Sequence, residues 1–178
     1  MELVVTRDGE AYRARWGEQQ WRCAVGRGGF TTIKREGDGA TPVGRWPFRR
    51  LLYRADRLPK PETALSAAAI AAEDGWCDAP DDPAYNQPVR LPYPASHEVM
   101  QRSDGLYDLV VVLGYNDDPV VAGLGSAIFL HVAQDDYRGT EGCVALAQAD
   151  LLRVLAEAGP GDAVRVVDGD PSERARDP

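Results

Sequence analysis

Two side chains in the last third of the chain have types and spacing suited to nucleophilic chemistry. His131 lies near the end of the apolar run Ala127–Val132, and Cys143 follows twelve residues later. A histidine within reach of a thiol can take its proton and later deliver it to a leaving amine. Gly142, directly before the cysteine, permits a tight turn whose backbone N–H groups can point at a developing oxyanion. This arrangement is typical of cysteine-dependent acyl transfer.

The same residues have plainer interpretations, which the spacing alone leaves open. A single cysteine is more often a small buried apolar residue than a nucleophile, and a strand-end histidine is often a surface or core residue. His131, Cys143, Cys77 and Cys23 are also possible zinc ligands. Because no Cys-x-x-Cys or His-x-x-x-His spacing occurs, we expect no metal site and no cofactor.

Composition excludes several classes of function. The chain has 178 residues, 44% of them apolar, with 20 basic and 28 acidic side chains and a net charge of −8. This length and apolar fraction suffice for one domain with its own core. The acidic balance argues against binding to nucleic acid or to an anionic membrane surface, both of which require a basic face. It gives no indication of oligomeric state.

The N-terminal residues also bear on location. The segment Met1–Glu10 has neither a basic region nor an apolar stretch of signal-peptide length, and no apolar run elsewhere is long enough to span a membrane. We therefore expect a cytoplasmic protein with three reduced thiols, or a periplasmic or cell-wall protein if a leader has been removed.

The elements that must position His131 and Cys143 are mainly strands. The sequence predicts a single catalytic domain over 1–168, followed by a polar, disordered tail over 169–178. An irregular but ordered insertion is expected over about 55–105, where the alanine-rich run Ala64–Ala72 has helix propensity but no amphipathic stripe. Apolar clustering and alternation predict strands at Glu2–Thr6, Ala11–Arg15, Gln20–Val25, Tyr107–Leu113, Ala127–Val132 and Ala163–Val167, with one helix at about Gln148–Ala158.

Several motifs appear together in order and give the chain a recognisable pattern. It resembles the L,D-transpeptidase catalytic domain family, also called YkuD-like. The resemblance extends over roughly residues 25–167. The residues that carry it are Thr41-Pro42-Val43-Gly44, the strand-end His131, Thr140-x-Gly142-Cys143-Val144, Asp150 with Leu151 and Leu152, and the closing strand from Gly161 to Val166.

The resemblance implies a mainly β fold, a YkuD-like β-sandwich of mixed sheets with one substantial helix after the catalytic cysteine. It also implies a cysteine acyl-enzyme formed on peptidoglycan stem peptides, at the L,D-bond after diaminopimelate. An amine acceptor makes such an enzyme an L,D-transpeptidase, whereas water makes it an L,D-carboxypeptidase, the activity favoured in the cytoplasm. In this family pattern His131 is the base, a backbone carbonyl near Gly139 or Thr140 orients it, and Gly142 and Cys143 supply the oxyanion N–H groups.

Two positions depart from the family pattern. Glu141 replaces a histidine and Ala145 replaces an arginine, and a carboxylate beside the thiol should raise its pKa unless it points away or pairs with a cation. Arg138 or Arg45 are candidates to replace the lost positive charge. The departures also favour an alternative, a catalytically silent member of the family that binds peptidoglycan peptides.

Further residues are candidates for substrate binding. Tyr115 and Asn116 follow a predicted buried strand and are placed to wall a cleft, although a plain turn is an equal interpretation. Tyr85 and Asn86 lie in an aromatic and polar segment that would suit a substrate lid or would simply anchor a long loop. Arg138 and Glu141 complete the predicted substrate-binding set.

Overall fold

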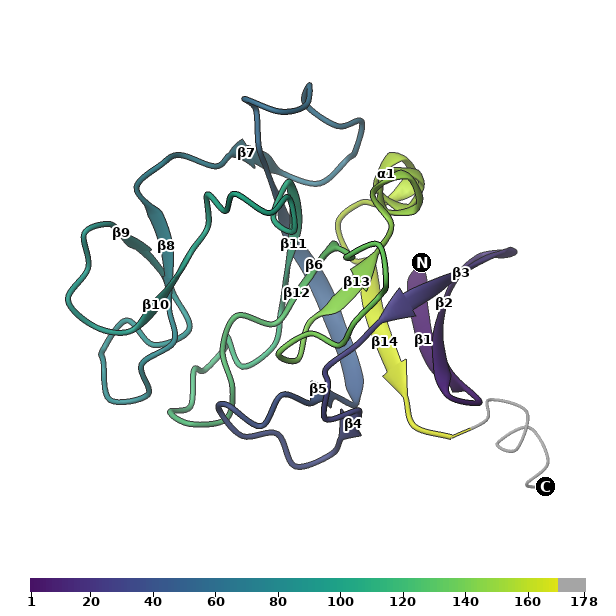
Figure 1. Cartoon of the computed structure of the whole chain (residues 1–178), viewed down its shortest axis with the longest axis horizontal. Coiled ribbons are helices and arrows are strands. Elements are labelled where there is room, and N and C mark those ends of the chain that lie inside the picture. The colour runs from purple at the N-terminus through teal and green to yellow at the C-terminus, as the bar shows by residue number, and fades with distance from the viewer. Residues whose placement is uncertain (170–178) are drawn as a thin grey trace.

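The computed structural model of the chain describes residues 1–169, so all but the first residue of the predicted tail lies outside the described residues. Figure 1 shows a compact group of strands with one helix beside it and a separate small sheet at one end. The elements are β1 (Glu2–Asp8), β2 (Ala11–Trp16), β3 (Gln19–Ala24), β4 (Phe30–Thr31), β5 (Thr41–Pro42), β6 (Gly44–Tyr53), β7 (Ala67–Ala69), β8 (Asp74–Cys77), β9 (Pro88–Arg90), β10 (His97–Val99), β11 (Leu109–Leu113), β12 (Phe129–Val132), β13 (Val144–Leu146), α1 (Gln148–Glu157) and β14 (Ala163–Val167).

The main sheet closes on itself. Its strand order is β11-β12-β13-β3-β2-β1-β14-β6-β7, and β11 also pairs with β6, so only β7 lies outside the ring. The pairs β1–β14, β12–β13 and β6–β7 are parallel and the remaining pairs of this sheet are antiparallel. The predicted fold class, mainly β with mixed sheets and one helix, is confirmed. The closure through β6 and β11 is a detail that strand patterns alone do not contain.

Side chains alternate between two apolar clusters along the central strands. All five residues of β11 are buried. Leu109, Val111 and Leu113 face the main core inside the ring, whereas Val110 and Val112 face a second cluster outside it. Because successive strand residues point to opposite faces, a continuously apolar strand of this kind must be covered on both sides.

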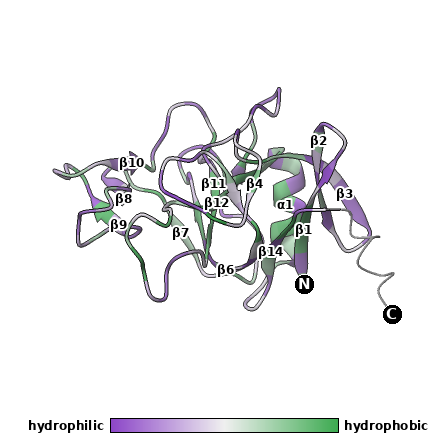
Figure 2. Ribbon diagram, turned by 90° about the horizontal axis from the view of Figure 1, so that it is seen from below, coloured by the Kyte–Doolittle hydropathy of each residue, from purple (hydrophilic) through white to green (hydrophobic). Residues whose placement is uncertain are grey.

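Helix α1 closes one side of the main core. Leu151, Val154 and Leu155 are buried, and the acidic Asp150 lies in the first turn, where it complements the helix dipole. The predicted helix is thus present and ends one residue earlier than expected. Figure 2 shows the apolar colouring of α1 and β1 against the hydrophilic outer part of β2 and β3.

The insertion at 55–105 is ordered and supplies the second cluster. Three of its four strands form the small sheet β10-β8-β9, and Trp76 and Met100 from this region pack with Phe129 of β12 and Cys143. The helix propensity of Ala64–Ala72 is not realised, since Ala67–Ala69 pairs with β6 as the parallel strand β7. Short alanine side chains let this segment add to an open sheet edge, and tertiary pairing outweighs local propensity.

Helices that could cross a membrane are not found within residues 1–169.

Candidate active site

His131 lies on β12 and Cys143 lies directly before the neighbouring parallel strand β13, on the same face. In the register of β12 and β13, His131 is paired with Ala145, and Cys143 lies two residues before Ala145. Side chains two residues apart on a strand share a face, so the imidazole and the thiol are diagonal neighbours. This face points away from the main core, and both residues line the same cavity of about 500 Å³. The twelve-residue spacing is spanned by a loop that returns the chain parallel to itself.

The turn before Cys143 is held by two threonines. Gly142 has a φ of +133°, and a Cβ at this position would lie 2.9 Å from the carbonyl oxygen of Ala40, so only glycine fits. The Thr140 hydroxyl donates to the Cys143 carbonyl at 2.6 Å and accepts the Gly142 N–H at 3.1 Å. The Thr41 hydroxyl donates to the Gly142 carbonyl at 2.8 Å. Thr41 of the upstream Thr-Pro-x-Gly motif therefore holds the turn before Cys143 directly.

The Cys143 thiol is buried and has polar partners on the backbone of the segment before it. Its S–H donates to the Ala127 carbonyl at 3.2 Å, and its sulfur accepts the Phe129 N–H at 3.3 Å. Burial raises the pKa of Cys143 to about 12, and the nearby charge of Glu98 adds to the rise. The resting thiol is therefore protonated at neutral pH and bonded to Ala127 rather than to His131.

The His131 ring is oriented by the backbone next to it. Its Nδ1 lies 2.8 Å from the carbonyl oxygen of Val132. Because a carbonyl only accepts, Nδ1 carries the proton and Nε2 is left as the basic nitrogen. The orienting carbonyl is thus that of Val132, and the expectation that Gly139 or Thr140 would supply it is wrong. Burial lowers the pKa of His131 to about 4, so the ring is neutral at neutral pH.

The cavity around this pair is lined by charged side chains of both signs. Arg102 and Arg138 are its basic side chains, and Tyr107 stacks edge-on against His131 with ring centroids 5.4 Å apart. The Tyr107 hydroxyl donates to Glu98, whose pKa is raised by burial. The carboxylates that line it are Glu36, Asp78, Glu98 and Glu141. Sequence reasoning missed Arg102, Glu98 and Tyr107, which belong to no motif and come from the insertion or its end.

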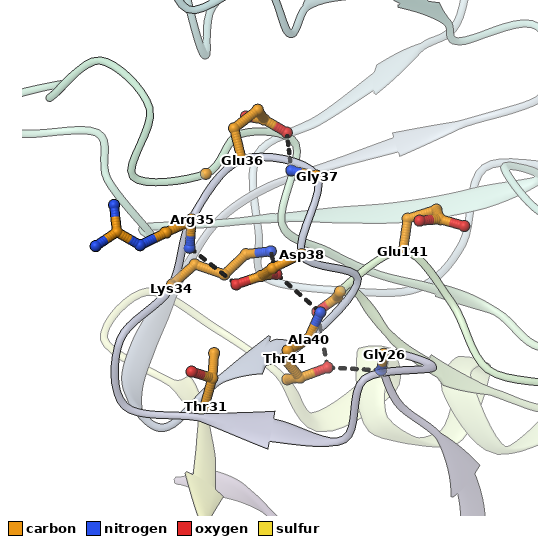
Figure 3. Close-up of polar contacts among 12 residues, drawn as sticks. Gly26, Thr31, Lys34, Arg35, Glu36, Gly37, Asp38, Ala40, Thr41 and Glu141 are labelled. Atoms are coloured by element: carbon orange, nitrogen blue, oxygen red, sulfur yellow. Dashed lines mark hydrogen bonds and ion pairs between the residues drawn. The ribbon is translucent and has the colours of Figure 1, made fainter.

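A buried lysine, Lys34, lies close to the turn before Cys143 and was also missed. Lys34 is 8% exposed and pairs with Asp38, which also accepts the backbone N–H groups of Arg35 at 2.8 Å and Ala40 at 2.9 Å. Figure 3 shows this loop, with Lys34 and Asp38 facing each other above Thr41. The Lys34 charge acts to lower the pKa of Cys143, although burial outweighs it. The glycine-rich loop Gly26–Gly44 is the local signal that could have drawn attention to it.

The two departures from the family pattern have clear structural settings. Glu141 is exposed and forms an ion pair with Arg27, so its carboxylate has a cationic partner of its own. Ala145 lines the cavity, and Arg138 does so as well, although it is exposed and pairs with Asp136 at 3.4 Å. Arg45, the other candidate for a replacement charge, instead binds Glu2 and the Gly161 carbonyl, and does not line the cavity.

Four of the predicted substrate-binding residues form an internal network outside the cavity lining. The Asn86 side chain donates to the carbonyl oxygens of Tyr115 at 3.1 Å and Asn116 at 2.7 Å. Asn116 in turn binds the backbone of Val121. The Tyr85 hydroxyl donates to Glu36 at 2.5 Å. A substrate-binding role for Tyr85, Asn86, Tyr115 and Asn116 stays a prediction, whereas Arg138 and Glu141 do line the cavity.

The described residues form a mainly β domain in which a cysteine and a histidine line one cavity. A comparison with known families is consistent with this description. Residues 2–166 match the family described as YkuD, the L,D-transpeptidase catalytic domain. The chain belongs to this family, as its motifs indicated.

The chain can also be compared with solved structures and with curated protein sequences. Among solved structures, the chain is similar to that of Bdellovibrio bacteriovorus Bd1075, with 16% sequence identity and a TM-score of 0.42. The match covers 96% of this chain and 50% of that chain, so this chain spans about half the length of that protein. No curated protein sequence matches the chain.

Proposed function

We propose that this protein transfers acyl groups from peptidoglycan stem peptides through a thioester on Cys143. The observation that carries the proposal is the placement of Cys143 and the basic Nε2 of His131 on one strand face, in one cavity. Family membership supports L,D-transpeptidase-type chemistry in general. The assignment of the nucleophile and of the substrate bond is our own.

In the proposed first step, the thiol leaves the Ala127 carbonyl and turns toward His131. Nε2 takes the thiol proton while the sulfur attacks the carbonyl carbon of diaminopimelate. The oxyanion binds the backbone N–H of Cys143 and that of Gly142, which must exchange its bond to the Thr140 hydroxyl. The carbon–nitrogen bond then breaks, and His131 returns the proton to the departing amine of D-alanine.

In the second step an acceptor takes the acyl group and frees the thiol. An amine acceptor gives a new crosslink, and water gives a shortened peptide. Both acceptors need a neutral His131 to remove their proton. The pKa of about 4 keeps the ring in this form at neutral pH.

The charges of the cavity suit the ends of such a substrate. The terminal carboxylate of D-alanine is a group that Arg102 and Arg138 can bind, replacing the arginine that Ala145 lacks. The ammonium group of the diaminopimelate side chain is complementary to the wall formed by Glu36, Asp78 and Glu98. One buried oxygen of Asp78 has no hydrogen-bond partner among the described residues.

The experiment is incubation with a disaccharide-tetrapeptide, with release of D-alanine followed by mass spectrometry and Cys143→Ala as control. We expect release by the native protein and none by the variant. A carbapenem should form a covalent adduct with the same cysteine. Absence of both release and adduct would contradict the enzyme proposal.

A second candidate function is a silent member of the family that binds these peptides. The observation that favours it is the resting thiol, which is protonated and bonded to Ala127 instead of His131. It predicts saturable binding of the tetrapeptide by native protein and by Cys143→Ala alike, with no turnover by either.

A further inference from the structure

The carbonyl group that accepts the Cys143 S–H belongs to a residue with an unusual backbone conformation. Ala127 has a φ of +51° and is 4% exposed. This left-handed conformation is unfavourable for a residue with a Cβ and persists only where surrounding contacts enforce it. The position of the Ala127 carbonyl therefore depends on whatever holds Ala127 in place.

The contact that holds Ala127 comes from the insertion. Its backbone N–H donates to Asn86 Oδ1 at 3.0 Å, and the same oxygen accepts Trp76 Nε1–H at 3.0 Å. The Asn86 amide nitrogen binds the carbonyl oxygens of Tyr115 and Asn116 on the other side. Asn86 is 4% exposed, so its side chain is a buried amide with both ends satisfied.

The hydrogen bond from the thiol to Ala127 favours one protonation state and one orientation. A carbonyl oxygen accepts from a neutral S–H and repels a thiolate, so this contact stabilises the thiol over the thiolate. It also directs the S–H toward Ala127, whereas the base His131 lies diagonally across the strand pair. Cys143 must break this contact to be activated.

We propose that Asn86 is a positioning residue that holds the Ala127 carbonyl in place and thereby keeps the Cys143 thiol protonated and turned from His131 at rest. The insertion then sets how readily the nucleophile is activated. This inference goes beyond the proposed function and does not require it, because the orientation and reactivity of the thiol can be measured without substrate.

The test is alkylation of the full chain by iodoacetamide, with labelling of each cysteine followed by peptide mass spectrometry across a range of pH. Asn86→Gly removes the side chain while glycine accepts the backbone φ of +56°. We expect Cys143 to be labelled roughly three- to tenfold faster at neutral pH, the ratio that corresponds to loss of one hydrogen bond, with a midpoint at lower pH. An unchanged rate and an unchanged midpoint would overturn the proposal.

Two controls separate a local from a global effect. Cys23 is 2% exposed in the main core, so its protection in the same sample reports that the ring of strands is intact. Gln87→Gly is the matched variant, since Gln87 is the next residue along the same loop and has an amide side chain that is exposed. We expect it to leave Cys143 labelling unchanged, and an equal acceleration in both variants would contradict the assignment to Asn86.

If Asn86→Gly also exposes Cys23, a double variant that adds Ala127→Gly separates coupling through Ala127 from a general loss of structure. Ala127→Gly removes the steric cost of the left-handed conformation, so Ala127 should then need less support from Asn86. The proposal predicts that Asn86→Gly changes Cys143 labelling less in the Ala127→Gly background, and that this background restores protection of Cys23. An effect of equal size in both backgrounds would contradict coupling through Ala127.

Discussion

The two faces of strands β12 and β13 differ sharply, although both are buried. The inner face carries Leu130, Val144 and Leu146, which pack into the main core. The outer face carries Phe129 and His131 on β12, and Cys143 and Ala145 at and just inside the start of β13, under cover of the insertion. Successive residues of each strand therefore point to opposite faces. One side chain packs in the main core, and the next points toward the cavity or the second apolar cluster.

Two buried thiols, Cys23 and Cys143, illustrate the difference between the main core and the outer face. Cys23 is opposite Leu146 in the β3–β13 pair and lies in the main core, and burial raises its pKa to about 12. Burial raises the pKa of Cys143 to the same value. Burial alone therefore does not distinguish a nucleophile from a core residue. Cys143 differs in having backbone polar partners and a cavity that it shares with His131.

The largest expected effect comes from removing one thiol or the other. We expect Cys143→Ala to lower D-alanine release by at least ~10³-fold, because no other group on the outer face can form the thioester. Cys23→Ala should leave the rate within about twofold and cost about 1 kcal/mol of unfolding free energy. Rates per folded protein, with folding checked by circular dichroism, measure both. Loss of activity in Cys23→Ala alone would reverse the assignment.

Removal of the base should have the next largest effect. His131→Gln keeps a polar side chain of similar size but cannot take the thiol proton, so we expect kcat to fall by about 10² to 10⁴-fold. Steady-state kinetics measure the change, and KM should change much less. His97→Gln is the matched control, because His97 lies in the insertion with its Nδ1 on the Ala95 carbonyl and should not affect kcat.

Substitutions on the inner face are expected to lower the free energy of unfolding and to leave kcat largely unchanged. Leu130→Ala removes a fully buried side chain next to His131 in sequence, and we expect a loss of about 3 kcal/mol in unfolding free energy. Denaturant titration measures this loss. If kcat per folded molecule fell as far as in His131→Gln, the separation of the two faces would not hold.

The buried imidazole also predicts a dependence of stability on pH. The pKa of His131 is about 4 in the folded chain against 6.5 for a free side chain, so the unfolded state binds the proton first as the pH falls. Stability should therefore decrease between about pH 6.5 and pH 4, with His131 contributing at most about 3 kcal/mol. Comparing native protein with His131→Gln isolates this share, since other groups titrate equally in both. An identical pH dependence in the two proteins would argue against a buried, neutral His131.

The smallest effect is expected at the turn directly before Cys143. Thr140→Val keeps the shape of the side chain but removes hydrogen bonds to the Cys143 carbonyl and the Gly142 N–H, so kcat should fall by about tenfold. Thr140→Ser should restore most of the rate, as it retains the hydroxyl. Kinetics of both variants test this, and equal losses in the two would assign the effect to packing instead.

The sequence predicted the outer face only in part, and the reasons are physical. Alternation and apolar runs indicated β11, β12 and α1, and the motif around Cys143 indicated the family. The Val132 carbonyl was missed because a strand-end histidine can turn to several nearby carbonyls, and only the fold selects one. Arg102 and Glu98 were missed because their insertion carries no motif and reaches the cavity only through tertiary packing.

Tertiary pairing also explains why the helix propensity of Ala64–Ala72 is not realised. An open edge of β6 offered backbone hydrogen bonds to Ala67–Ala69, and such pairing lies far outside any local sequence window. In the same way, Asn86 and Tyr85 could be recognised as a polar and aromatic segment, but not as partners of Ala127 and Glu36.

The most direct test of the central claim is detection of the acyl-enzyme itself. Protein mixed with a disaccharide-tetrapeptide is quenched in acid within the first turnover, and the intact mass and its peptide map are recorded. We expect an added mass equal to the substrate less D-alanine, located on Cys143 and absent from Cys143→Ala. A quenched protein without this mass, or with it on Cys23 or Cys77, would contradict the account.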